Sequence, residues 1–217
     1  MKKNRVEAFT DGVFAIVITL LILELKLPDV GADGLPAALR NLLPSIGAYV
    51  LSFGLIGMYW VFHHYSMTLI QEVDGVLLWL NIVFLLFISF MPFPTMMMGR
   101  YPYQTLPVVI YGCNLLLANV NGFVMLIYVR KNPRLASHFF TDAIYRRQFR
   151  TYIVVNGVYA VLVGLAFVTP AVSAAAYALV GVCLVVRSAM NMGIGQCIIG
   201  GVAARRDGVS AQLGSAS

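Results

Sequence analysis

Residues 5–27 read RVEAFTDGVFAIVITLLILELKL, an apolar stretch with a carboxylate near its start. The stretch is long enough for a transmembrane helix, which needs about 20 mainly apolar residues. If this helix starts near Arg5, Asp11 lies about two turns inside its apolar boundary. An ionisable group at that depth costs at least ~2.5 kcal/mol unless it is paired or hydrated. Arg5 is six residues away and lies on another helical face, so Asp11 needs a partner from a different helix.

The whole composition agrees with a membrane protein. Of the 217 residues, 60% are hydrophobic and 11% are charged, whereas a soluble domain has about 45–50% apolar and about 25% charged residues. Disorder and a secreted disulfide scaffold are excluded too, because the chain is apolar and has only three cysteines. All three fall in apolar stretches, where a reduced, buried thiol is expected.

The spacing of the charged residues predicts the number of spans. Residues 151–186 contain no Asp, Glu, Lys or Arg, which is too long for one crossing, and Thr169-Pro170 near the middle marks a turn between two crossings. We predict an all-α membrane protein with six spans, at about 6–27, 42–67, 76–98, 105–129, 151–168 and 171–188. The spans form one unit over residues 1–204, in which 188–204 either extend the last helix or lie at the membrane surface. Residues 205–217 are expected to be a disordered cytoplasmic tail.

The basic residues predict the orientation of these spans. Cytoplasmic loops of membrane proteins carry an excess of Lys and Arg. With both termini in the cytoplasm, the outer segments hold three basic residues and the inner segments twelve. The outer ones are Lys26, Arg40 and Arg100; the inner ones are Lys2, Lys3, Arg5, Arg130, Lys131, Arg134, Arg146, Arg147, Arg150, Arg187, Arg205 and Arg206. The net charge of +6 is therefore interpreted as a signal of topology and of contact with anionic lipid, and no nucleic-acid partner is expected.

The second span supplies candidate partners for Asp11. This span ends near Met67, so His63 lies about four residues, and Trp60 about seven, from its cytoplasmic end. At ~1.5 Å per residue these groups are at nearly the same depth as Asp11. We expect Asp11 and Arg5 to meet Trp60, His63 or His64 across the interface of the first two helices. The alternative is that both histidines simply lie at the membrane boundary.

An apolar stripe follows one face of the first helix. Ile16, Leu20, Leu23 and Leu27 are spaced by four, three and four residues, and Thr19 borders them. Such a stripe faces lipid or packs in a core in most membrane proteins. It forms a hydrophobic constriction that gates by dewetting when several copies surround an axis. In the fifth span, Gly157 and Gly164 are seven residues apart and suggest close helix packing.

The chemistry of an enzyme is missing from the sequence. It has no Cys/His cluster with zinc spacing, no GxSxG and no glycine-rich phosphate loop after a strand. We therefore expect no enzymatic activity and no cofactor.

The motif in residues 5–12 resembles a known signature. RVEAFTDG is similar to the RxxxFSDG motif that opens the first helix of the transmembrane-protein-175 family, with Thr10 in place of the usual serine. The following VFAIVITLLILEL, the YWVFHHY of residues 59–65 and the six-span layout resemble the family as well. Its members are potassium channels of endolysosomes and, in a shorter form, of bacteria and archaea. The resemblance implies a multi-pass protein of a prokaryotic inner or plasma membrane.

The resemblance also implies a mechanism. Four identical subunits would surround a pore lined by the first helix, without the TVGYG pore loop of ordinary potassium channels. Ile16, Leu20 and Leu23 would form the constriction, and Thr19 would contribute to a modest preference for potassium over sodium, with the permeating potassium ions passing near Ile16 and Thr19. The remaining motif positions would form a packing network that anchors the pore helix, namely Arg5, Phe9, Thr10, Asp11, Gly12, Trp60, His63 and His64.

Two other functions remain open. One is a proton-coupled secondary transporter that uses Asp11 with His63 or His64 as a proton relay, although the chain lacks the two inverted halves of many such proteins. The other is a structural membrane protein that conducts nothing. Proton permeation beside potassium is a variant of the channel hypothesis.

Overall fold

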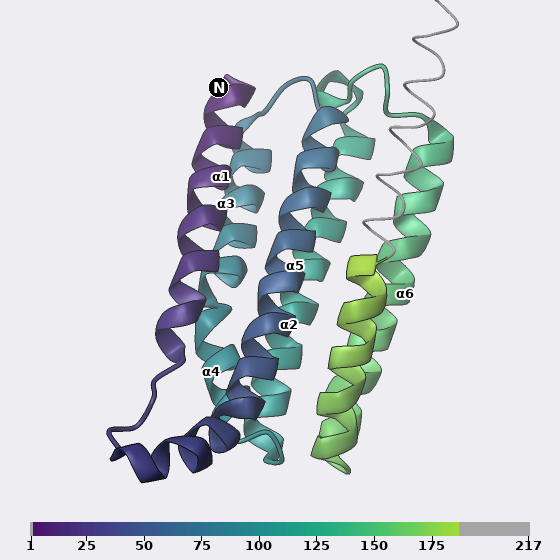
Figure 1. Cartoon of the computed structure of the whole chain (residues 1–217). Helices are drawn as coiled ribbons and strands as arrows, with labels where there is room; N and C mark the ends of the chain where they lie inside the picture. Colours follow the sequence, from purple (N-terminus) through teal and green to yellow (C-terminus); the bar gives the residue numbers. More distant parts are fainter. Residues whose placement is uncertain (1, 187–217) are drawn as a thin grey trace, which may run out of the picture.

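The computed structural model describes residues 2–186, and the segments 188–204 and 205–217 lie outside that range. In the described range the chain folds into long helices that run side by side (Figure 1). The α-helices are α1 (Lys3–Leu20), α2 (Leu35–Thr68), α3 (Gly75–Phe90), α4 (Pro92–Arg100), α5 (Thr105–Lys131), α6 (Asp142–Ala166) and a further helix over Pro170–Val186. Three short 3₁₀ helices lie in or next to the connections, η1 (Leu21–Glu24), η2 (Ala32–Gly34) and η3 (Pro133–Leu135).

The helices confirm the expected all-α, multi-pass architecture. Five helical stretches are long and apolar enough to cross a membrane: Lys3–Glu24, Leu35–Thr68, Gly75–Arg100, Thr105–Lys131 and Asp142–Ala166. Pro170–Val186 is a shorter apolar helix within the described residues. The stretch Gly75–Arg100 comprises α3 and α4, with Pro92 at their junction. The helix is interrupted there because a proline has no backbone N–H to donate to the preceding turn.

Several helix bounds differ from the sequence prediction. α2 begins at Leu35 rather than near residue 42, and α6 begins at Asp142 rather than near residue 151. The loop expected over residues 130–150 is therefore partly helical, with the Thr141 side chain capping the first turn of α6 by accepting from the Ile144 N–H at 3.4 Å. Hydropathy marks the membrane boundary, whereas a helix continues through polar residues until a cap ends it. At the other end of α1, the α-helix stops at Leu20 and η1 continues to Glu24.

Glycines in α5 allow two close helix contacts. A Cβ at Gly112 would collide with the ring and hydroxyl of Tyr177, and one at Gly122 would lie 2.7 Å from the Tyr152 hydroxyl. Gly157 has no atom within 4 Å of a built Cβ, and neither has Gly164, so the close packing that their spacing suggests is not present within residues 2–186. Gly99 of α4 and Gly181 of the Pro170–Val186 helix are packed as closely, against Ser45 and Leu51 of α2.

Two connections at the same end of the bundle are tied together in a group that we call the loop clamp. The Gln71 N–H donates to the Leu135 carbonyl at 2.8 Å, which joins the α2–α3 connection to the α5–α6 connection. Beside this bond, Asp74 accepts from the Tyr128 hydroxyl at 2.7 Å and from Arg134 at 3.3 Å. Burial pushes the pKa of Asp74 up, but the Leu77 N–H, the Tyr128 hydroxyl and Arg134 together hold this pKa below its ordinary value.

Candidate pore helix and its anchoring network

α1 has one covered and one uncovered face. The covered face packs on α2 and α3 and carries Val6, Thr10, Phe14 and Val17. On the uncovered face, Ile16, Leu20 and Leu23 are 60%, 43% and 62% exposed. The predicted apolar stripe is therefore left open by the described part of the chain.

Thr19 lies next to this stripe and is also exposed. Its hydroxyl lies 2.8 Å from the Ile16 carbonyl and 3.1 Å from the Ala15 carbonyl, and it donates to the backbone of its own helix. A hydroxyl that donates its proton keeps two acceptor lone pairs. The Thr19 oxygen therefore presents negative partial charge to the uncovered side of α1.

The covered face of α1 is held by a buried polar chain across three helices. The Asn81 amide of α3 donates to the Thr10 hydroxyl of α1 at 2.9 Å. The amide oxygen of Asn81 is 2.8 Å from Nε2 of His63 in α2. With the amide in this orientation its oxygen only accepts, so Nε2 of His63 donates. All three side chains are buried. The two hydrogen bonds from Thr10 through Asn81 to His63 therefore join α1, α3 and α2, and each of the three side chains has a partner.

Asp11 finds its partner in the second helix, as the depth comparison predicts. Nε1 of Trp60 donates to the Asp11 carboxylate at 2.9 Å. The Trp60 ring stacks on the His64 ring with centroids 5.9 Å apart. Among the described residues no hydrogen bond joins Asp11 to either histidine, and His63 is engaged with Asn81 instead.

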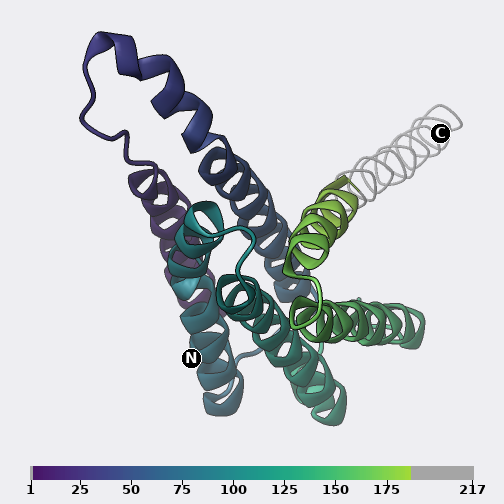
Figure 2. The same cartoon turned by 90° about the horizontal axis from the view of Figure 1, so that it is seen from below.

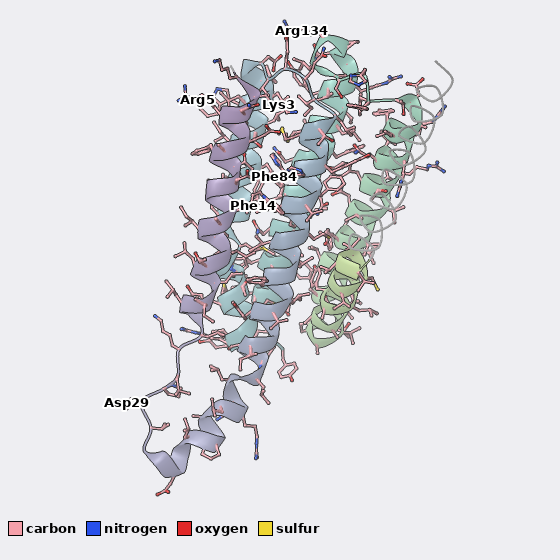
Figure 3. The ribbon with its side chains drawn as sticks, turned by 45° about the horizontal axis from the view of Figure 1, so that its top comes forward. Lys3, Arg5, Phe14, Asp29, Phe84 and Arg134 are labelled. Atoms are coloured by element: carbon pink, nitrogen blue, oxygen red, sulfur yellow. The ribbon has the colours of Figure 1, made fainter. Side chains whose placement is uncertain are left out.

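Aromatic rings pack around the buried histidine. His63 stacks on Phe84 of α3 with centroids 5.7 Å apart, and Phe14 of α1 lies 6.3 Å from His63 and 6.1 Å from Phe84. Figure 3 places Phe14 and Phe84 inside the bundle, between neighbouring helices. These separations are typical of favourable ring pairs, so the polar chain is enclosed by packed rings.

Three of the expected network residues lie elsewhere. Arg5, Phe9 and Gly12 are exposed, on the face of α1 that also carries Ile16. Arg5, Phe9, Gly12 and Ile16 are spaced by four, three and four residues, and residues with this spacing share one face of a helix. Arg5 forms no ion pair within the described range, and it is Lys3 that approaches Glu7, at 3.7 Å. The expected meeting of Arg5 with Trp60 or the histidines is therefore not seen within one chain.

Asn81 is the site residue that the sequence analysis missed. It is the only amide in α3, whose other residues are apolar except for Ser89 and Gly75. A lone amide within an apolar span is itself a signal, because burying it without partners costs free energy. The depth of Asp11 points to α2 alone, whereas the lone amide of Asn81 points to polar partners for α3.

A cavity of about 60 Å³ borders the buried histidine. It lies among α2, α5 and α6, and its lining includes His63, Asn119, Gln148 and Tyr152. A water molecule needs about 10–15 Å³ of such volume, so the cavity has room for a few waters beside His63. Over residues 2–186 no group of three or more His, Cys, Asp or Glu side chains is placed to hold a metal ion.

Comparisons with known proteins add to this geometry. The family model described as "Endosomal/lysosomal potassium channel TMEM175" matches residues 5–92, which contain both the uncovered stripe and the buried polar chain. A potassium channel of a Chryseobacterium species is 40% identical over 120 residues, which cover 55% of this chain and 61% of the relative. The mouse endosomal/lysosomal proton channel TMEM175 is 35% identical over 125 residues, which cover 52% of this chain and 25% of the relative. This chain thus spans less than two thirds of the curated relatives it matches.

A solved structure matches over a greater length. The crystal structure of a lysosomal potassium-selective channel TMEM175 homolog from Chamaesiphon minutus superposes with a TM-score of 0.77 at 28% identity. The superposition covers 86% of this chain and 97% of the other. The similarity therefore extends beyond the first three helices to most of the described bundle.

Proposed function

We propose that this chain is a member of the TMEM175 family and one subunit of a homotetrameric channel that conducts potassium passively, with a modest preference over sodium. The uncovered stripe of Ile16 and Leu20 on α1 and Leu23 on η1 carries the proposal. In a membrane protein such an open apolar face meets lipid, another subunit or a pore, and the match of residues 5–92 to a potassium-channel family favours the pore.

The stripe supplies the constriction in this proposal. When four copies of α1 surround an axis, Ile16, Leu20 and Leu23 each form an apolar ring, spaced by about one helical turn. Narrow apolar rings exclude water, and conduction stops when they dewet. Slight widening rehydrates the rings and admits hydrated cations.

Thr19 supplies the cation preference. Its hydroxyl donates to the α1 backbone at 2.8 Å, which leaves the oxygen lone pairs directed toward a passing ion as a weak ligand. A single ring of neutral hydroxyl oxygens replaces only part of a hydration shell, which fits modest rather than strict selectivity.

The buried polar chain sets the rotation of α1. Thr10 bonded to Asn81, and Asp11 bonded to Trp60, fix two neighbouring positions of α1 against two different helices. A small rotation of α1 strains both bonds, so the network holds the stripe in one orientation until gating shifts it.

Potassium flux into liposomes tests the proposal. We expect wild-type protein to pass potassium down its gradient, and Ile16→Asn and Leu23→Asn to increase the flux severalfold, because a polar ring stays hydrated. Leu179→Asn is the matched control, since Leu179 is 66% exposed but lies in the Pro170–Val186 helix, on the opposite side of the bundle from α1 (Figure 2). Absence of flux in wild type and both α1 variants, in protein that is folded and inserted, would reject the channel.

Proton conduction is the second candidate, because the mammalian relatives carry the name of proton channels. A pH-sensitive dye inside the same liposomes separates the two ions. Proton entry that the α1 variants increase in parallel with potassium indicates a shared pore. Saturable potassium flux that requires a proton gradient would instead favour the transporter hypothesis with Asp11 and the histidines.

A further inference from the structure

α2 is much longer than a membrane is thick. Its 34 residues correspond to about 51 Å, against about 30 Å for the hydrocarbon core. Pro44 lies inside the helix, and Figure 1 shows the first turns of α2 running across the bundle axis rather than along it. The first turns of α2 therefore belong outside the span.

The membrane boundary lies close to this bend. A Cβ at Gly99 of α4 would be 2.7 Å from the Ser45 Cα, so the residue after Pro44 touches the end of α4. Arg100, Tyr101 and Tyr103 follow and are exposed. Tyrosine and arginine side chains are typical of the membrane–water interface, which places residues 35–43 beyond the hydrocarbon core.

Residues 25–43, which we call the α1–α2 flap, carry an uncovered apolar stripe of their own. Leu35, Leu39 and Leu43 are spaced by four residues and are 40%, 47% and 59% exposed, while Arg40 and Asn41 lie on other faces of the helix. Three exposed leucines on one helical face, outside the hydrocarbon core, indicate a surface that is covered in the assembled protein.

The direction of the flap identifies what covers it. Figure 2 shows the flap projecting past the end of α1, away from α5 and α6. The proposed channel surrounds its axis with four copies of α1, so a flap that projects past α1 reaches the neighbouring subunit.

The charges of the flap support the same partner. Lys26, Asp29, Asp33 and Arg40 form no ion pair within residues 2–186, and Figure 3 shows Asp29 far from the bundle. In a ring of identical subunits, one part of each flap can contact a different part of the next flap, so the basic groups of one flap can meet the carboxylates of its neighbour.

We propose that the α1–α2 flap docks on the adjacent subunit, with Leu35, Leu39 and Leu43 buried in the contact and Arg40 facing the acidic residues of that subunit's flap. The inference rests on the proposed function, since it takes the tetramer as its frame. The contact links neighbouring subunits at the end of the pore helix and holds the four copies of α1 together beyond the membrane.

Spin labels on a cysteine-free background test the docking. The three native cysteines become serine, and single labels are placed through Leu39→Cys, Leu43→Cys and, as a lipid-facing reference, Leu179→Cys. Collision with oxygen reports lipid, and collision with a nickel chelate reports water. We expect the labels at 39 and 43 to show low collision with both, and at least threefold less oxygen collision than the reference.

Either kind of high accessibility overturns the inference. High oxygen collision at 39 and 43 means that the flap lies in the lipid, and high nickel collision means that it lies in water. Potassium flux measured on the same preparations keeps the two proposals apart. Flux with an accessible flap rejects only the docking, whereas a protected flap in a tetramer without flux rejects only the channel.

Charge substitutions give a second readout of the same contact. Leu39→Asp and Leu43→Asp are expected to raise the fraction of dissociated subunits at least tenfold in native mass spectrometry, while Ala37→Asp, on another face, leaves it unchanged. Equal effects of all three substitutions would contradict a specific contact through the leucine stripe.

Discussion

At the residue scale, the decisive side chain is Asn81. A single amide partners two buried groups from two other helices, the Thr10 hydroxyl and the His63 ring. Removing one partner of a buried hydrogen bond leaves the other unsatisfied, which costs more than the bond itself contributes. Asn81 therefore has more influence on the position of α1 than any residue of the α1 motif that lies on the uncovered face.

We predict that Asn81→Leu destabilises the fold. Two buried polar groups lose their partner, at about 1–3 kcal/mol each, and α1 loses its hydrogen bond to α3. Thermal unfolding in detergent, followed by circular dichroism, measures the effect. Ser89→Ala in the same helix is the control, because the Ser89 hydroxyl is exposed and donates only to its own helix. An unfolding temperature of Asn81→Leu equal to that of Ser89→Ala would contradict the role of the amide.

The loop clamp gives a prediction about pH. Because the pKa of Asp74 is lower in the folded protein than its ordinary value of 3.8, the charged carboxylate stabilises the fold at pH values above about 4. That contribution disappears as the pH falls through the lowered pKa. Unfolding temperatures between pH 7 and pH 3 are expected to fall less steeply for Asp74→Asn than for wild type, with Glu72→Gln, at an exposed residue of the same connection, matching wild type. If the unfolding temperatures of all three proteins fell equally as the pH is lowered, the loop clamp would have no part in the pH dependence of stability.

At the element scale, sequence spacing predicted the uncovered stripe of α1 but not what holds the opposite face. Periodicity identifies a face, because residues three and four apart share it. It does not tell which amide of another helix lies opposite Thr10, since that depends on how the helices pack. The depths of Asp11 and Trp60 in the membrane follow from residue counts alone. The contact between these two side chains is therefore predictable from the sequence.

The glycines show the same limit, because their spacing does not tell which of them packs against another helix. A pair seven residues apart in α6 has the spacing of a packing motif, yet close contacts are made by glycines of other helices, among them Gly112 and Gly122 of α5. Which glycine faces a neighbouring tyrosine depends on the rotation of each helix in the bundle. Helix bounds such as the start of α2 at Leu35 were missed because the charges that divide spans do not interrupt helices.

We predict opposite effects for two glycine substitutions. Gly112→Ala forces Tyr177 to move and overpacks the α5 contact, which costs about 1–3 kcal/mol. Gly157→Ala meets no atom within 4 Å, so it gains helix propensity of about 0.5–1 kcal/mol. Chemical denaturation of both variants measures the difference. A destabilised Gly157→Ala would indicate that this face of α6 packs on another subunit.

At the scale of the whole molecule, the basic residues predict that the flap and the loop clamp lie on opposite sides of the membrane. A membrane-impermeant maleimide tests this orientation in intact cells that produce cysteine-free protein with one added thiol. We expect Asp29→Cys, in the flap, to react from outside, and Arg146→Cys, beside the loop clamp, to react only after the cells are opened. The reverse pattern would invert the topology while leaving the fold unchanged.

The polar chain through Asn81 has a consequence for biosynthesis. The polypeptide emerges from the ribosome in sequence order, so α1 and α2 enter the membrane before Asn81 has been made. The Thr10 hydroxyl and the His63 ring then still lack the amide that is their common hydrogen-bond partner. Until α3 inserts, Thr10 and His63 face each other or lipid without their shared partner. The first two helices are then an unfinished pair that α3 completes, and a pause in translation after α2 would expose that pair to quality-control proteases. The order of synthesis thus makes α3 the element that commits the first half of the subunit to its fold.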